Sequence, residues 1–303
     1  MRKLALTLVP LLLVACGREF AAPVGVVAAD VVIHQGTGSW DIYVYDVNSG
    51  TATQASSISG ADEWNPSFSN NGQAIVHEVI GFGYSSFDLY VTQIATGVST
   101  LLAGGEGGND AVWSPTDRFI AFDGSWGDPN VYVVPATGGT RTLVRANAMD
   151  AEWGLDDHQL VFRDQSDWSI RTIDIRSGIE HVVAAFGVTP AWSRDGRRIA
   201  YSDNNNIFVI AVDPAGAAVG APVQLTFDGS DVYNQQLSWS NDGQTILFHS
   251  NRGNTVYDFD LWVVPVFGGA PTQLFGRVGE QEYDPTFYGK KLVAFAGFTP
   301  PSP

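Results

Sequence analysis

The chain alternates apolar and polar residues over short stretches, and one pair of stretches recurs along its length. The segments "AWSRDGRRIAYSD" (191–203) and "LSWSNDGQTILFHSN" (237–251) each predict a strand, a tight Asp-Gly turn and a second strand. The first strand of each copy carries an aromatic residue, and these aromatics are Phe68, Trp113, Trp153, Trp192, Trp239 and Phe287. In all but the last copy, a second aromatic or a histidine follows nine residues later. The chain therefore contains six copies of one predicted hairpin.

A second pair of predicted strands follows each hairpin except the last, and one such pair (41–54) precedes the first hairpin. The aromatics are 39 to 48 residues apart, and four short strands repeated with a period of about 40 to 45 residues are typical of the blades of a β-propeller. The sequence therefore predicts an all-β fold, a six-bladed β-propeller with a blade shared between the N- and C-terminal segments. The segments 30–36 and 291–297 both fit the same slot in the shared blade, and the pattern leaves both open.

The fuller copies of the hairpin, "NPSFSNNGQAIVH" (65–77) and "TPAWSRDGRRIAYS" (189–202), resemble the repeat of the TolB-type propellers. The resemblance extends over about 30–296. It implies a propeller with one face, here called the top face, on which the peptidoglycan-associated partner of TolB docks. This face carries the loops that enter each first strand and those that link the second and third strands. Where TolB has an additional N-terminal α/β domain, we expect only a short tether.

The N-terminal segment predicts export. Residues 1–15 have a basic start and an apolar run, as in a signal peptide, and "LVAC" resembles the lipobox of bacterial lipoproteins, which implies a lipid on Cys16. We expect a signal peptide (1–15), a lipidated tether (16–29), a propeller (30–296) and a flexible tail (297–303). The location would be the cell envelope, at the outer membrane and facing the periplasm or the cell surface. The alternative is a plain signal peptide with an incidental cysteine.

The formal net charge of −16 argues against nucleic acid as a partner, because nucleic-acid binding needs a basic surface. We assign most of the acids to the top face, and basic residues such as Arg118 and Arg194 to the hairpin turns of the opposite face. Such an acidic face would attract a basic partner. Membrane contact would come from the lipid on Cys16 instead.

One position of the repeat, just before each first strand, forms a predicted ring around the channel mouth. Its members are Asn65, Asp110, Asp150, Thr189, Gln236 and Asp284. We expect these ring residues to contact a partner or ligand, and their hard oxygens would suit Ca²⁺ if they converge. The alternative is that they cap turns or bond to neighbouring blades. No other cofactor or metal is expected, and His77, in the aromatic slot, is expected in the core.

The sequence contains no G-x-S-x-G, no H-E-x-x-H and no phosphate-binding glycine loop. We therefore predict a non-enzymatic, monomeric scaffold that binds an envelope protein through its top face. The alternative is a Ca²⁺-dependent, lactonase-like hydrolase or a small-ligand binder that uses the central channel. A purely structural surface protein is a third interpretation.

Overall fold

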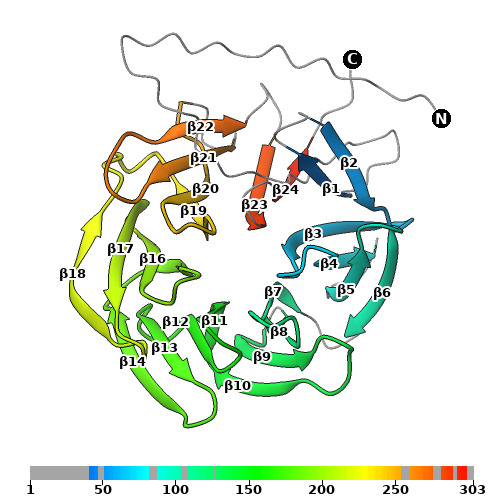
Figure 1. Cartoon of the computed structure of the whole chain (residues 1–303), viewed down its shortest axis with the longest axis horizontal. Coiled ribbons are helices and arrows are strands. Elements are labelled where there is room, and N and C mark those ends of the chain that lie inside the picture. Colours follow the sequence, from blue (N-terminus) through cyan, green and yellow to red (C-terminus); the bar gives the residue numbers. More distant parts are fainter. Residues whose placement is uncertain are drawn as a thin grey trace.

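The computed structural model describes residues 41–46, 51–81, 87–103, 108–125, 127–253, 259–275, 281–288 and 292–298. These residues form four-stranded antiparallel sheets that stand around a central axis (Figure 1). The predicted all-β propeller is therefore confirmed. Within these ranges, no helix is long and apolar enough to cross a membrane.

Five sheets, here called blades 1 to 5, are each built from four consecutive strands, with the first strand nearest the axis (Figure 1). Blade 1 contains β3 (Ala61–Phe68), β4 (Ala74–Gly81), β5 (Asp88–Gln93) and β6 (Val98–Ala103). Blade 2 contains β7 (Asn109–Trp113), β8 (Phe119–Asp123), β9 (Asn130–Pro135) and β10 (Thr142–Ala146). Blade 3 contains β11 (Ala148–Trp153), β12 (Gln159–Asp164), β13 (Ile170–Asp174) and β14 (Ile179–Ala184).

The last two of these blades follow the same order of strands. Blade 4 contains β15 (Val188–Trp192), β16 (Arg198–Asp203), β17 (Asn206–Val212) and β18 (Ala218–Gln224). Blade 5 contains β19 (Asn234–Trp239), β20 (Thr245–Ser250), β21 (Asp260–Pro265) and β22 (Thr272–Phe275). Each of the five thus corresponds to one predicted hairpin followed by its second strand pair.

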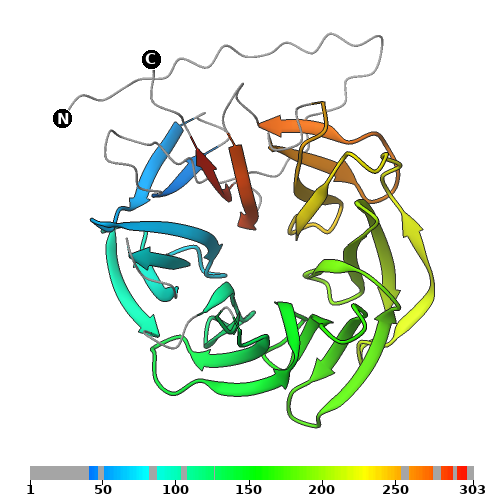
Figure 2. The ribbon, with the colours of Figure 1, turned by 180° about the vertical axis from the view of Figure 1, so that it is seen from behind.

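A further sheet, here called the composite sheet, combines strands from both ends of the chain. It contains β1 (Ile42–Asp46), β2 (Thr51–Ser56), β23 (Gln281–Tyr288) and β24 (Leu292–Phe298), in the order β2-β1-β24-β23 (Figures 1 and 2). β1 and β24 pair at Tyr45 and Val293. The strand beside β1 is therefore β24, and the competing segment 30–36 lies outside the described residues. The structure thus has five blades that are each continuous in sequence, and the predicted count of six is not shown, because the remaining four strands form a composite sheet from both ends of the chain.

The hydrophobic core lies between neighbouring blades. One cluster joins Ile207 of blade 4 to Trp239 and Phe248 of blade 5. Another joins Val133 of blade 2 to Phe162 of blade 3. Burying each large side chain contributes about 1.5–3 kcal/mol, and a single sheet offers no second surface to bury it against. The recurrence of the aromatics along the sequence thus reflects the recurrence of this interface.

The hairpin turns adopt the backbone geometry that the sequence predicts. Gly72, Gly196 and Gly243 have φ of 69°, 70° and 64°, a left-handed conformation that glycine adopts without steric cost. Two copies have aspartate instead of glycine at this position, and in one of them Asp117 takes the equivalent conformation with φ of 59°. Aspartate tolerates left-handed φ better than most side chains. The hairpin therefore keeps its shape although the motif is incomplete.

A buried polar network lies where the composite sheet meets blade 1. Ser56 of β2 donates to Glu63 Oε1 (2.6 Å) and its hydroxyl lies 3.0 Å from that of Ser99. The Ser99 hydroxyl lies 2.7 Å from that of Thr92, which lies 2.8 Å from His77 Nε2. His77 Nδ1 is 3.7 Å from Glu63 Oε1 and has no hydrogen-bond partner, so the hydrogen bonds form a chain from Glu63 to His77 that does not close. His77 is fully buried, which confirms its predicted place in the core.

Candidate functional site

The predicted ring residues share one unusual backbone conformation. Asn65, Asp110, Asp150, Thr189 and Gln236 have φ between 45° and 58°, although none is glycine. Each lies in a β-bulge, where the pairing of the first and second strands of its blade shifts register. A bulge re-aims the side chain of the extra residue. The repeat thus directs one side chain per blade toward the channel mouth.

These five residues line one cavity of about 90 Å³ at the centre of the propeller. The left-handed conformation is unfavourable for most of them, and most of all for the β-branched Thr189. Such conformations cost about 1–3 kcal/mol each and persist only where the surrounding structure holds them. The ring is therefore held by contacts elsewhere, and for three of the five residues these contacts come from the preceding blade.

Carboxylates hold the backbone of the ring across three successive blade interfaces. Glu78 of blade 1 accepts the backbone N–H of Asp110, and Asp123 of blade 2 accepts that of Asp150 (2.6 Å). Asp150 in turn accepts the N–H of Thr189 (3.3 Å). Buried N–H groups need such partners because water cannot reach them. Part of the acidity near the channel therefore serves the assembly of the blades.

Two side-chain contacts complete the mouth. Arg163 of β12 donates through Nε to Asp150 Oδ2 (2.6 Å), which compensates the charge of this carboxylate. Gln236 of blade 5 donates to Asp110 Oδ1 of blade 2 at 3.5 Å. This second contact spans the channel. The mouth is thus bounded by groups that already bond to one another.

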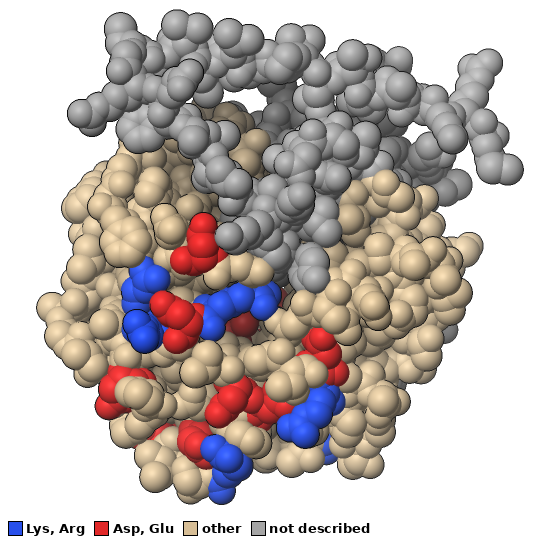
Figure 3. Space-filling model, in the orientation of Figure 1, with Lys and Arg blue, Asp and Glu red and all other residues tan. Residues whose placement is uncertain are grey.

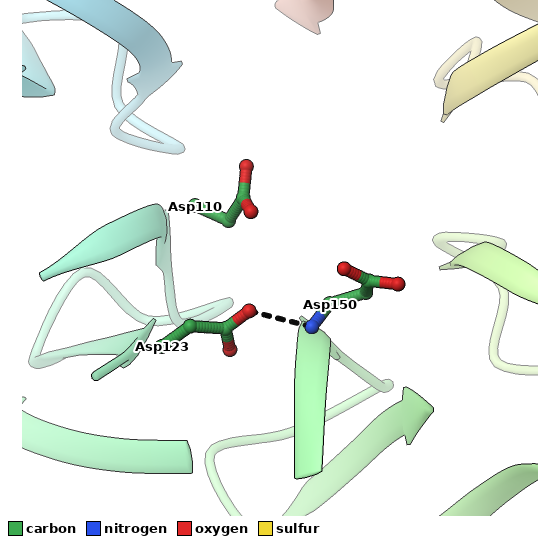
Figure 4. Close-up of side chains that lie close together, drawn as sticks. All are labelled: Asp110, Asp123 and Asp150. Atoms are coloured by element: carbon green, nitrogen blue, oxygen red, sulfur yellow. Dashed lines mark hydrogen bonds between the residues drawn. The ribbon is translucent and has the colours of Figure 1, made fainter. Parts of the chain in front are cut away.

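Asp110, Asp123 and Asp150 converge at one side of the mouth (Figure 4). One carboxylate oxygen from each lies within 4.8 Å of the others. Asp123 is fully buried, and its Oδ1 has no hydrogen-bond partner. Burial, together with the charges of Asp110 and Asp150, raises the pKa of Asp123 well above its usual value. This carboxyl therefore favours either a proton or a cation beside it.

Glu152, two residues beyond Asp150, lies deeper in the channel and lines both this cavity and the next one below it. Burial raises the pKa of Glu152 to about 7, and the positive charge of Arg194 opposes the rise. The channel therefore contains acidic groups at two depths.

Charge is less segregated between the two faces than the sequence suggested. Four arginines lie among the acids of the top face, namely Arg145, Arg163, Arg171 and Arg252. Burial opposes ionisation of Asp164, yet the Ser166 hydroxyl and the charges of Arg145 and Arg171 hold its pKa below the usual value. On the face seen in Figure 3, basic and acidic side chains also lie next to one another. The excess of acids is thus partly neutralised in place.

The structure brings together five of the six predicted ring residues, while their role in binding stays a prediction. Asp284 lies in β23 at the corresponding register shift, between Tyr283 and Thr286. Its side chain does not belong to the part of the chain that the structure describes. Cys16, the signal peptide (1–15) and the tether (16–29) also lie outside the described residues.

Sequence reasoning missed a set of buried polar residues on the second strands, three of which contact the ring residues: Glu78, Asp123 and Arg163. These residues directly follow the core aromatic or histidine, and they are Glu78, Asp123, Arg163, Ser202 and His249. All are at most 9% exposed. A polar residue at the same place in five buried strands was the available signal. Alternation along one strand does not reveal which residues of the neighbouring blade a side chain will contact, so this signal does not by itself identify the contacts.

No family model matches the chain, and no curated protein matches it in sequence. A putative TolB from Agrobacterium tumefaciens superposes with a TM-score of 0.68 at 19% identity, over 87% of this chain and 100% of that chain. TolB from Acinetobacter baumannii gives 0.63 at 17% identity, over 85% of this chain and 62% of that chain. An oligogalacturonate lyase in complex with manganese gives 0.54 at 14% identity, over 86% and 77%. The chain therefore has a TolB-like propeller fold, which an enzyme of different function shares.

Proposed function

We propose that this TolB-like propeller is a non-enzymatic scaffold of the bacterial envelope that binds a protein partner through its top face. The ring carries the proposal: five side chains are held at the channel mouth in left-handed bulges. Binding costs less when the contacting groups are already ordered. The TolB resemblance implies a docking partner at this same face.

The proposal also includes the N-terminal predictions. A lipid on Cys16 would anchor a monomer to the outer membrane. A single acyl chain binds a protein to a membrane only weakly, whereas two or more acyl chains anchor it stably. The composite sheet is counted as the sixth blade, which closes the ring and removes the free edges of β1 and β24.

The test is a pull-down from bacterial envelopes with the full chain as bait. Asp110→Lys reverses a charge at the mouth, where the Asp110 carboxylate accepts from Gln236 at 3.5 Å. Asp156→Lys makes the same change at an exposed hairpin position on the opposite face. We expect Asp110→Lys to lose a partner that the wild type and Asp156→Lys both retain. Equal recovery by all three proteins would reject the top face as the docking site.

A channel cation is the second candidate, and it is favoured by the convergence of three carboxylates and the unpartnered Oδ1 of Asp123. Oxygen donors suit Ca²⁺, which takes six to eight of them. Asp110 and Asp123 would supply ligand oxygens, since Arg163 already compensates the charge of Asp150. Such an ion would support the alternative of a Ca²⁺-dependent hydrolase or small-ligand binder. The manganese in the structure of the oligogalacturonate lyase is bound by that protein, and it is not an argument for an ion in this chain.

Thermal melts of the full chain in EDTA and then in Ca²⁺, Mg²⁺ and Mn²⁺ test the cation. A bound ion raises the melting temperature by mass action, and Asp123→Asn should abolish the rise. No rise in the wild type, or an equal rise in the variant, would reject this site.

A further inference from the structure

Four large aromatic side chains are exposed in the described part of the chain, and three of them lie on the top face. Trp168 lies in the loop between β12 and β13, while Phe186 and Phe227 lie in the loops that enter β15 and β19. The fourth, Phe267, lies between β21 and β22 on the opposite face. Single exposed apolar residues are common on proteins, so such residues gain meaning only where they gather.

Trp168 and Phe186 do gather, and they are here called the aromatic pair. Their ring centroids are 6.1 Å apart and their planes are inclined by 16°. One loop lies within blade 3 and the other leads into blade 4, and the N–H of Gly187 donates to the Trp168 carbonyl (2.9 Å). Although the rings cover part of each other, 43% of Trp168 and 46% of Phe186 stay exposed. The top face thus presents a preformed apolar patch.

The backbone of Trp168 is held in a conformation that a bulky side chain disfavours. Its φ is 61°, in the left-handed region. Its N–H donates to the Asp164 carbonyl (2.9 Å), so both backbone polar groups of Trp168 are fixed. The Asp167 carboxylate accepts from the N–H (2.9 Å) and the hydroxyl (2.6 Å) of Ser169, which ties the residues on either side. Strained residues of this kind cluster at binding sites, where the strain places a side chain in advance.

Arg163 connects the aromatic pair to the channel mouth. Its guanidinium carbon lies 4.5 Å from the centre of the Trp168 ring, and its Nε donates to Asp150 Oδ2 at 2.6 Å. Arg163 is buried, so its contacts are ordered before any partner arrives. In a standard interface one partner covers about 800 Å² of the other. A protein that covers the mouth therefore also covers the aromatic pair.

The mouth differs from the aromatic pair in its charge. Its described carboxyl groups are those of Glu78, Asp110, Asp123 and Asp150, and its one described guanidinium is that of Arg163. Burial raises the pKa of Asp123, so this carboxyl favours a proton, and the other three still outnumber the arginine. The mouth therefore favours a cation, and the neighbouring patch favours an apolar group.

We propose that the aromatic pair anchors the partner, a protein segment that seats an apolar side chain on Trp168 and Phe186 and places a lysine or arginine at the mouth. Tryptophan and arginine are enriched among the residues that dominate the energy of protein interfaces. This inference rests on the proposed docking at the top face, and it adds which side chains of the partner are recognised.

Variants of the full chain test the aromatic pair, with the partner that the wild type recovers as the probe. Trp168→Asn removes the indole and keeps the loop, because asparagine adopts left-handed φ more readily than most residues. Phe186→Ser removes the second ring. Each should raise the Kd of the partner at least about tenfold. Phe267→Ser, the matched change on the opposite face, should bind within about twofold of the wild type.

The outcomes separate this inference from the proposed function. If Asp110→Lys loses the partner while Trp168→Asn and Phe186→Ser bind like the wild type, the top face remains the docking site and the aromatic pair is rejected as the anchor. An equal loss by Phe267→Ser also overturns the assignment. If no partner is recovered, or if every variant retains it, both proposals fall.

Photo-cross-linking tests the chemistry of the partner. Phe186→p-benzoylphenylalanine keeps an aromatic ring at the site, and mass spectrometry identifies the segment that it captures. We expect an apolar residue at the cross-link and a lysine or arginine within roughly five positions of it, since an extended chain spans about 3.3 Å per residue. A captured segment without a basic residue, or a cross-link to a second copy of this chain, overturns the proposal.

Discussion

Replacing Glu63 with glutamine should change how the stability of the propeller depends on pH. Glu63 lies fully buried between β1 and blade 1, where it accepts from the backbone of Ile42 (3.2 Å) and from Ser56 (2.6 Å). Burial, despite these donors, raises its pKa from 4.5 to about 7, and the charge of Asp41 adds to the rise. The folded protein therefore holds a proton that the unfolded chain releases.

The sign and size of the effect follow from this difference. A carboxyl whose pKa is raised in the folded state contributes stability that is fully present below pH 4.5 and is lost as pH rises through about 7. At about 1.4 kcal/mol per pH unit, the loss over this window is roughly 3 kcal/mol. Glutamine does not titrate. The stability of the wild type relative to Glu63→Gln should therefore fall by roughly 3 kcal/mol across the window.

The assay is urea unfolding of the full chain, followed by tryptophan fluorescence from pH 4.5 to 7.5. Burial lowers the pKa of His77 to about 3, so its contribution is lost in the opposite direction, as pH falls below 6.5. Both proteins contain His77, and its effect cancels in their difference. Ser56→Ala keeps the carboxyl but removes a donor that lowers its pKa, so the stability of this variant should still fall with pH, over a window that extends to higher pH than in the wild type. Parallel profiles for the wild type and Glu63→Gln would refute the reasoning.

Three further predictions concern the repeat and the ring. Trp239→Phe should lower the free energy of unfolding by about 1 kcal/mol more than Trp192→Phe, because only the Trp239 indole has an acceptor; equal losses would contradict this. Thr189→Gly should raise stability by about 1 kcal/mol, since glycine adopts a φ of 45° without strain; a lower melting temperature would contradict it. Asp150→Ala should cost about 3–5 kcal/mol in urea unfolding, because its arginine partner stays in place without a counter-charge; wild-type stability would show that water compensates the arginine.

Much of the fold could be predicted because its information is local. Each hairpin, a strand, a turn and a second strand, is specified by about 13 consecutive residues. Gly196 and Gly243 identify the turns, because the positive φ of these positions is one that only glycine adopts freely. Six repeats of this unit imply blades, since one sheet cannot bury its own faces. The alignment of the repeats also predicted which residues surround the channel mouth, because equivalent positions in a closed array lie at the same height.

The chemistry of the site could not be predicted in the same way. The second-strand residues Asp123 and Arg163 act on the ring from neighbouring strands and blades, and no spacing along one strand encodes that contact. The choice between 30–36 and 291–297 had the same difficulty, since both segments have the pattern of a strand. The pairing of β24 with β1 is a matter of position in space.

The sequence by itself determined the features that recur in every repeat. These are the strands, the turns, the aromatic positions between blades and the place of the ring residue in each repeat. These features depend on residues that are close together in the chain. Only the tertiary structure decided which carboxylates hold a backbone N–H, which are compensated by arginine and which remain buried without a partner, as Asp123 Oδ1 does. Those outcomes depend on distances between blades and on the exclusion of water, and both arise only when the ring has assembled.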